Sequence, residues 1–410
     1  MRADLAVRPG RAAGAAAGIE ALFAEARRRR RRRRLVSAVA VAGLAASVLA
    51  ATAWLGGWPA PGPGAPGGPP PAGRAARSGT SPSVAWVDYD GRLHVANLAT
   101  AQQRVAARTT AYPVTPLAQA GGNIYWVDWG SGFPVVRELD LATGTTLDLG
   151  YGMSVFASSD GRHVFIARTG TSVTEIPATG SGPELELTAP RGWYVAAKPA
   201  AVAGGIVVSS VDEQANPRPA TIAVWDLRTG AATVLGQTVA SAYFGPISAV
   251  TPPGAGYSLI AWMPSRCKLL VNCPIQITNT ATRSSITLHS PMPHGFALGG
   301  AFSPDGRELA VVVNTSRGPC CASAELAIAS SRTGSLRLVP RARFTIGEDV
   351  AWVQWLPAGT QLLAGAGTGS YIVNAATLSA RPLFFVHSRD HNIQDSQDVN
   401  YSAVVIAQPG

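Results

Sequence analysis

The stretch FSPDGRELAVVV, residues Phe302–Val313, contains an Asp-Gly turn followed by an apolar run rich in valine. Glycine accepts the positive φ that tight turns demand, and β-branched residues favour strands. Two other stretches have the same plan of turn and apolar strand: SSDGRHVFIA (Ser158–Ala167) and WLPAGTQLLAGAG (Trp355–Gly367). The stretch is therefore one copy of a repeating unit.

A second phrase follows each copy and marks the period of the repeat. ELDLATG ends at Gly144, VWDLRTG at Gly230 and IASSRTG at Gly334. Weaker copies complete a series of threonines 36 to 53 residues apart: Thr100, Thr143, Thr179, Thr229, Thr282, Thr333 and Thr377. A polar-Thr-Gly tip between two apolar stretches is typical of a β-hairpin.

Each unit thus reads as four antiparallel strands, here called a, b, c and d, with the Asp-Gly turn between a and b and the Thr-Gly turn between c and d. Four strands every 40 to 50 residues predict an all-β fold, a β-propeller. Seven blades fit residues 83–410, although six or eight stay possible. The first copy lacks strand a, and the surplus at Val399–Gln408 is positioned to supply it and close the ring.

The Ser-Pro-Asp-Gly phrase before an apolar strand resembles the TolB-like and WD40-like propeller repeats of bacterial envelope proteins. The phrase is well formed once, at Phe302–Val313, and degraded in the other copies. The resemblance implies a propeller that binds proteins or peptides, and it implies no shared catalytic residues.

The positive charge of the chain is concentrated at its N-terminus. The net charge is +10, and residues 1–34 contain eleven arginines against three acidic residues. Eight of the arginines form one run: Arg27, Arg28, Arg29, Arg30, Arg31, Arg32, Arg33 and Arg34. Leu35–Trp58 follows with 24 uncharged residues, enough for one transmembrane helix. Because positive charge stays in the cytoplasm, we expect a basic cytoplasmic tail (1–34), a membrane anchor (35–58) and an extracytoplasmic propeller.

The membrane-proximal region leaves one alternative open. Ala51–Ala53 reads ATA, a plausible signal-peptidase site, and cleavage there would secrete the protein. Residues 59–82 are rich in Pro and Gly and are expected to form a linker. Arginine runs also bind nucleic acid or anionic lipid, but the position of this one at a membrane boundary favours a topogenic role. We therefore expect no nucleic-acid partner.

The four cysteines all lie beyond the expected membrane anchor. An even number in an oxidising compartment favours disulfides, and three pairings are open for Cys267, Cys273, Cys320 and Cys321. Zinc is disfavoured because the spacings are not CxxC and no histidine lies near either pair. A vicinal pair in a propeller also resembles the ring of quinoprotein alcohol dehydrogenases, but the tryptophan of their repeat is absent after Gly144, Gly230 and Gly334.

The loops offer the candidate binding face. The b–c connections of the fourth, fifth and sixth units are long, and loops of this kind emerge side by side on one face of a propeller. The candidates are Trp129, Trp193, Tyr194, Asp212, Glu213, Arg266 and Arg317.

The expected function is binding, as a scaffold or sensor at the cell envelope, with a protein or peptide partner. The sequence indicates no catalytic, metal or cofactor residue, since HExxH and GxSxG are both absent. Two alternatives stay open. One is an enzyme that uses the central channel, such as a lyase, a hydrolase or a quinoprotein-like oxidoreductase. The other is signalling through the cytoplasmic segment Ala17–Arg29.

Overall fold

The computed structural model describes the propeller region with a few gaps. The described residues are 82–88, 91–110, 117–130, 132–179, 182–195, 199–210, 220–238, 246–264, 273–288, 296–315, 323–344, 351–366, 369–383 and 403–406. The expected cytoplasmic tail and membrane anchor lie outside these residues, and so does almost all of the linker. Among the described residues no helix is long and apolar enough to span a membrane.

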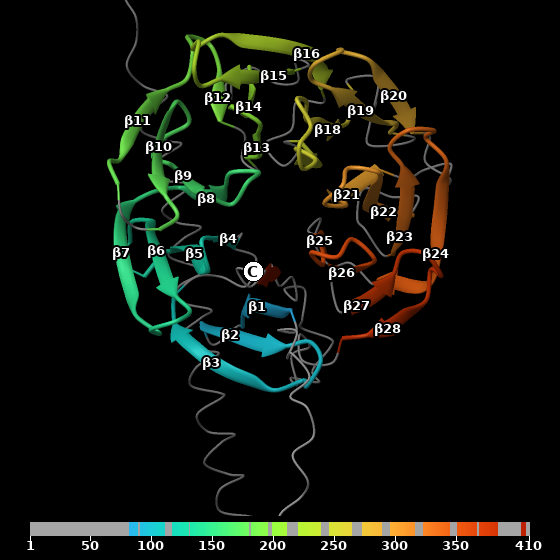
Figure 1. Ribbon diagram of the computed structural model, residues 1–410, viewed down its shortest axis with the longest axis horizontal. Coiled ribbons are helices and arrows are strands. Elements are labelled where there is room, and N and C mark those ends of the chain that lie inside the picture. The colour runs from blue at the N-terminus through green and yellow to red at the C-terminus, as the bar shows by residue number, and fades with distance from the viewer. Residues whose placement is uncertain are drawn as a thin grey trace, which may run out of the picture. The chain divides into compact units, whose positions relative to one another are not determined.

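Seven antiparallel sheets surround a central axis, and each is one blade of a β-propeller (Figure 1). From the axis outward, blade 1 consists of β29 (Ala403–Ile406), β1 (Ser83–Val87), β2 (Arg92–Asn97) and β3 (Gln103–Arg108). Blade 2 consists of β4 (Ala118–Ala120), β5 (Asn123–Asp128), β6 (Val135–Asp140) and β7 (Thr146–Tyr151). Blade 3 consists of β8 (Ser154–Ala157), β9 (His163–Ala167), β10 (Ser172–Pro177) and β11 (Leu185–Thr188).

Blade 4 differs from the others because its inner strand is split in two. Blades 4 and 5 are β12 (Tyr194–Val195) with β13 (Ala201–Val202), β14 (Gly205–Ser209), β15 (Ala220–Asp226), β16 (Ala232–Thr238); and β17 (Ser248–Val250), β18 (Leu259–Trp262), β19 (Ile275–Asn279), β20 (Ser285–Leu288). Blades 6 and 7 are β21 (Phe296–Phe302), β22 (Glu308–Asn314), β23 (Ala324–Ser330), β24 (Leu336–Phe344); and β25 (Ala351–Trp355), β26 (Gln361–Ala366), β27 (Gly369–Asn374), β28 (Ala380–Pro382).

The two ends of the propeller sequence meet in blade 1. Strand β29, from the C-terminal surplus, pairs antiparallel with β1, and Ser83 lies opposite Ile406. The predicted closure and the predicted count of seven blades are both confirmed. Without β29, strand β1 would expose an unpaired edge at the inside of blade 1.

The recurring threonines mark the c–d turns, as predicted. In blade 2 the Asp140 carboxylate accepts hydrogen bonds from the backbone N–H groups of Ala142 (2.8 Å) and Thr143 (3.2 Å). The next residue, Gly144, has a φ of +74°. The equivalent residue has a positive φ in five other blades: Ala101, Gly230, Arg283, Gly334 and Leu378. The turn geometry is therefore preserved even where glycine is absent.

The stretch Phe302–Val313 forms the end of β21, the a–b turn and most of β22. The Ser303 hydroxyl donates to Asp305 Oδ1 (2.6 Å), which also accepts from the Arg307 backbone N–H (3.1 Å). Gly306 has a φ of +70°. Ser158 and Asp160 make the same serine–aspartate hydrogen bond in blade 3, also at 2.6 Å. A shared side-chain network thus fixes these two turns.

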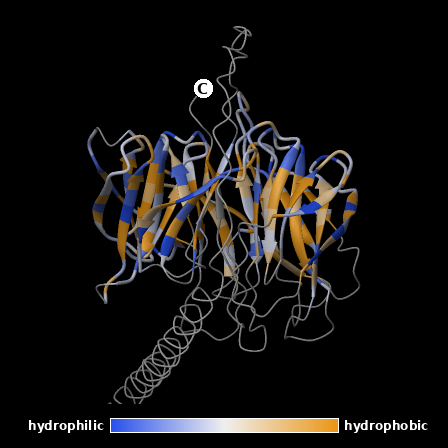
Figure 2. Ribbon diagram, turned by 90° about the horizontal axis from the view of Figure 1, so that it is seen from below, coloured by the Kyte–Doolittle hydropathy of each residue, from blue (hydrophilic) through white to orange (hydrophobic). Residues whose placement is uncertain are grey.

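The hydrophobic core lies within and between the blades. In Figure 2 the hydrophobic, orange segments lie along the strands, and strand β22 alone buries Leu309 through Val313. A glycine makes room for a tryptophan ring between two paired strands of blade 7. A Cβ added to Gly365 would lie 2.4 Å from Cε2 of Trp352, its partner across β25 and β26. Such close packing ties particular sequence positions to particular blades.

Candidate functional site

The propeller has two faces, on which the loops between strands lie, and the antiparallel strand order decides which loops share a face. The b–c connections and the links from one blade to the next lie on one face, and the a–b and c–d turns lie on the other. The sequence-predicted candidates Trp129, Trp193 and Tyr194 belong to the first of these faces. A groove between blades 1 and 2 belongs to the second.

Five exposed apolar side chains gather on the first face over blades 2 to 4, and we call this set the apolar face. Its members, with their exposed fractions, are Trp129 (42%), Phe133 (70%), Tyr151 (46%), Met153 (52%) and Tyr194 (39%). Ordinary surfaces expose single apolar residues without consequence, whereas grouped ones mark interaction sites.

Backbone hydrogen bonds link the loops that carry the apolar face. Trp129 and Phe133 lie in the b–c connection of blade 2, whose Pro134 carbonyl accepts from the Gly152 N–H (3.1 Å), next to Met153. The Met153 N–H donates to the Ala167 carbonyl of blade 3 (2.8 Å). On the far side of blade 3, the Gly170 carbonyl accepts from the Val195 N–H (2.7 Å), next to Tyr194. Hydrogen bonds between neighbouring blades thus join the segments that carry these side chains.

Two arginines accompany the apolar face. Arg168 in blade 3 donates through Nε to Thr174 Oγ1 (2.8 Å) and through Nη1 to the Leu149 and Tyr151 carbonyls of blade 2. It therefore fixes the end of β7, which carries Tyr151. Arg191 is exposed in the connection between blades 3 and 4. Aromatic residues, methionine and arginine are the types enriched in protein–protein interfaces.

The remaining sequence-predicted residues have varied positions. Trp193 is partly buried and packs against the core between blades 3 and 4. Cys273 is buried and disulfide-bonded, and its partner lies outside the described residues. The others outside the described residues are Arg27 to Arg34, Asp212, Glu213, Arg266, Cys267, Arg317, Cys320 and Cys321. The pairing of the four cysteines stays a prediction.

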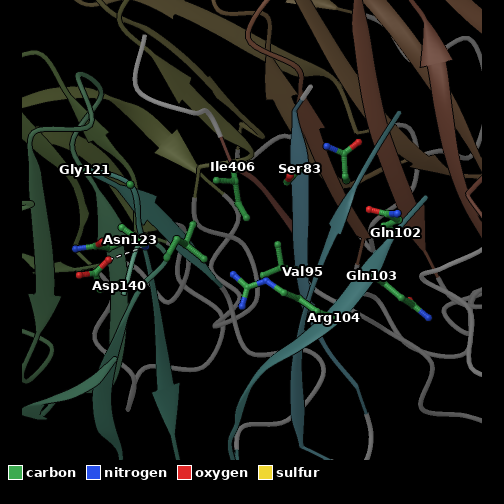
Figure 3. Close-up of a pocket in the computed structure, with 13 residues that line it drawn as sticks. Ser83, Val95, Gln102, Gln103, Arg104, Gly121, Asn123, Asp140 and Ile406 are labelled. Carbon is green, nitrogen blue, oxygen red and sulfur yellow. Dashed lines mark hydrogen bonds between the residues drawn. The ribbon is translucent and has the colours of Figure 1, made fainter. Parts of the chain in front are cut away.

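The groove between blades 1 and 2 is a cavity of about 840 Å³. Its blade 1 wall is a set of paired residues: Ser83 lies opposite both Asn97 and Ile406, and Val95 lies opposite Arg104. Figure 3 shows the Arg104 side chain directed across the groove toward Asn123 and Asp140 of blade 2. No feature of the sequence predicted this groove.

The blade 2 wall of the groove connects to a buried carboxylate. Asn123 lines the groove and donates its amide N–H to Glu138, a buried residue of β6 that also accepts from the Tyr125 hydroxyl (3.4 Å). Burial raises the pKa of Glu138, although these two hydrogen bonds oppose the shift. Burial and the nearby Glu138 raise the pKa of Tyr125, which stays protonated. Glu138 and Tyr125 therefore hold the Asn123 side chain in place at the wall of the groove.

The opposite edge of the blade 2 wall is a c–d turn with a permanent charge. Hydrogen bonds from the Thr143 hydroxyl and from the backbone N–H groups of Thr143 and Ala142 lower the pKa of Asp140. Asp140 is thus a carboxylate at neutral pH. Within the described ranges, no three His, Cys, Asp or Glu side chains lie close enough together to hold a metal ion.

Comparison with known proteins finds similar solved structures but no matching sequence family. No family model matches the chain, and no curated protein does. Similar solved structures include TolB from Acinetobacter baumannii (14% identity, 80% of this chain, 67% of that chain, TM-score 0.44). Another is an oligogalacturonate lyase from Vibrio parahaemolyticus (12% identity, 74% of this chain, 85% of that chain, TM-score 0.45). A third is a protein from Lactobacillus plantarum (14% identity, 74% of this chain, 95% of that chain, TM-score 0.49). TolB is thus among the similar structures, as the sequence repeat predicted.

Proposed function

We propose that this protein is a binding scaffold whose propeller docks a protein partner on the apolar face. The observation that carries the proposal is the grouping of Trp129, Phe133, Tyr151, Met153 and Tyr194 on one face of three consecutive blades. Burying exposed apolar side chains is favourable by about 25 cal/mol per Å², and large aromatic residues dominate the energetics of interfaces.

The proposal includes a place in the cell. The arginine run before Leu35–Trp58 supports a single-pass anchor with the propeller outside the cytoplasm, so the partner is an envelope or extracellular protein. Cleavage at Ala51–Ala53, within the apolar segment, would leave the propeller in the same compartment. A fusion of alkaline phosphatase after residue 410 tests the membrane topology, because this enzyme is active only outside the cytoplasm.

The experiment that tests the proposed function compares two double variants of the full chain. Trp129→Ser with Tyr194→Ser changes the apolar face. Leu185→Ser with Val234→Ser is the matched control, because these exposed residues belong to the outer strands β11 and β16. Proteins retained from the envelope fraction are quantified by mass spectrometry.

We expect at least one protein to be retained by the wild type and the control and lost by the face variant. Equal retention by all three proteins contradicts the proposal. Thermal melting of each variant shows whether the fold is intact.

The alternative function, an enzyme that uses the central channel, is tested by mass. The purified chain is weighed under native and denaturing conditions. A mass excess that disappears on denaturation identifies a bound cofactor or metal and favours the enzyme. Equal masses leave the binding scaffold as the better account.

A further inference from the structure

The groove between blades 1 and 2 contains one positive charge, Arg104, that has no ion-pair partner among the described residues. Arg104 is exposed, and no carboxylate in the described part of the chain lies within ion-pair distance of its guanidinium. By contrast, Arg137, Arg337 and Arg343 each have a carboxylate partner within 3.2 Å. Arg104 is directed into the groove (Figure 3), where a ligand carboxylate would meet its planar, bidentate donor surface.

Asp140 lies on the opposite wall but is not within ion-pair distance of Arg104, and it is engaged by its own turn. Asp140 Oδ1 accepts from Ala142 and Thr143, the same role that Asp226 has in blade 4. The carboxylate is thus part of the turn scaffold, which recurs around the ring. Arg104 is the charged side chain of the groove that takes part in no turn, and the ligand group complementary to it is an anion.

The uncharged side chains of the groove are of two kinds. Four carboxamides line it, from Asn97, Gln102, Gln103 and Asn123. A carboxamide can donate and accept hydrogen bonds, as a peptide group does. Gln102 and Gln103 offer both capacities, whereas the Asn97 oxygen already accepts from the Ala99 and Thr100 backbone N–H groups and the Asn123 amide already donates to Glu138. Val95, Leu141 and Ile406 supply an aliphatic floor, continuous with the core between blades 1 and 2.

We propose that this groove binds an acidic peptide segment. Its carboxylate would pair with Arg104, its main chain would bond with the carboxamides, and a small aliphatic side chain would lie on the floor. No aromatic ring lines the groove among the described residues, so the C–H face of a sugar ring would have no aromatic stacking partner. The groove lies on the face opposite the apolar face, and the proposal is independent of the proposed function.

The test uses the purified full chain and a peptide array. The array displays hexapeptides with blocked ends that combine aliphatic residues with Asp or Glu, and a matched set carries Asn or Gln instead. We expect the wild type to retain the acidic set over the amide set. Soluble versions of the retained peptides then give dissociation constants by fluorescence anisotropy.

Two arginine variants locate the site. Arg104→Gln keeps much of the aliphatic stem that lies against Val95, and it should weaken binding about tenfold or more, as expected for loss of a charge-assisted hydrogen bond. Arg108→Gln is the matched control, because Arg108 lies exposed on the same strand β3 and does not line the groove. It should bind as the wild type does.

Three results would overturn the proposal. The first is a wild type that retains the acidic and amide sets equally. The second is equal binding by the Arg104 and Arg108 variants. The third is Arg104-dependent binding of an oligomer of uronic acids without binding of any peptide, which would show that the carboxylate comes from a sugar.

Discussion

Replacing Arg283 with glycine should stabilise the propeller, although it removes a whole side chain. Arg283 occupies the left-handed position of the c–d turn in blade 5, with a φ of +58°. Gly230 occupies the same position in blade 4, with a φ of +72°. The two residues allow opposite substitutions at one structural position, Arg283→Gly and Gly230→Ala.

The expected change in the free energy of unfolding follows from two opposing contributions. A left-handed conformation costs a non-glycine residue roughly 1–2 kcal/mol. Glycine also makes the unfolded chain more flexible, which takes back roughly 0.4–1 kcal/mol. The net gain for Arg283→Gly is then about 1 kcal/mol or less, since the side chain is exposed. For Gly230→Ala the signs reverse, and an added Cβ meets no atom within 4 Å, so strain alone should cost about 1 kcal/mol.

Urea unfolding of the full chain, followed by tryptophan fluorescence, measures both changes. Arg228→Gly is the control, because Arg228 lies exposed in the turn of blade 4 and has no positive φ. Glycine there should give no gain in stability. The reasoning is refuted if Arg283→Gly shifts the midpoint no further upward than Arg228→Gly does, or if Gly230→Ala is neutral.

Three further predictions concern the turns, the core and the closure of the ring. Burial alone would raise the pKa of Asp305, but hydrogen bonds from the Ser303 hydroxyl and the Arg307 N–H outweigh it and lower that pKa. The ionised Asp305 therefore stabilises the folded state above the unfolded pKa of about 3.9, and this contribution to the free energy of unfolding is lost as the pH falls through the folded pKa. Asp305→Asn should therefore lose stability at pH 7, with the difference from wild type shrinking below about pH 4 in acid titrations of the unfolding free energy. Gly365→Ala should cost about 1–3 kcal/mol, because its Cβ would lie 2.4 Å from Trp352, and a thermal midpoint equal to wild type would contradict this packing. Removal of residues 403–410 takes away β29 and should produce aggregates in size-exclusion chromatography, whereas an unchanged monomer peak would show that closure is dispensable.

The sequence predicted the architecture well because the repeat is local. In every blade but the third, the c–d turn combines an Asp, Asn or Ser cap with a threonine, so Thr143, Thr229 and Thr333 mark blades without any knowledge of long-range contacts. The closure by β29 followed from one missing strand and one surplus strand. The split inner strand of blade 4 was not predicted, because β12 and β13 are two residues each and leave almost no strand pattern.

The candidate sites were harder to predict, since they depend on neighbouring blades. Trp129 and Tyr194 were identified from their loop positions. Tyr151 and Met153 were missed because their exposure depends on how blade 2 meets blade 3. The groove was missed entirely, because its blade 1 wall joins Ser83 to Ile406 from the two ends of the propeller sequence. No short motif can encode such a wall.

The proposed binding function is tested most directly by photo-crosslinking in living cells. A benzoylphenylalanine residue is placed at position 129 or 194 on the apolar face, or at position 185 or 234 on the outer strands. The account predicts a discrete adduct with the same protein from both face positions and no such adduct from the outer positions. Adducts that are absent at the face, or equally abundant at all four positions, would contradict it.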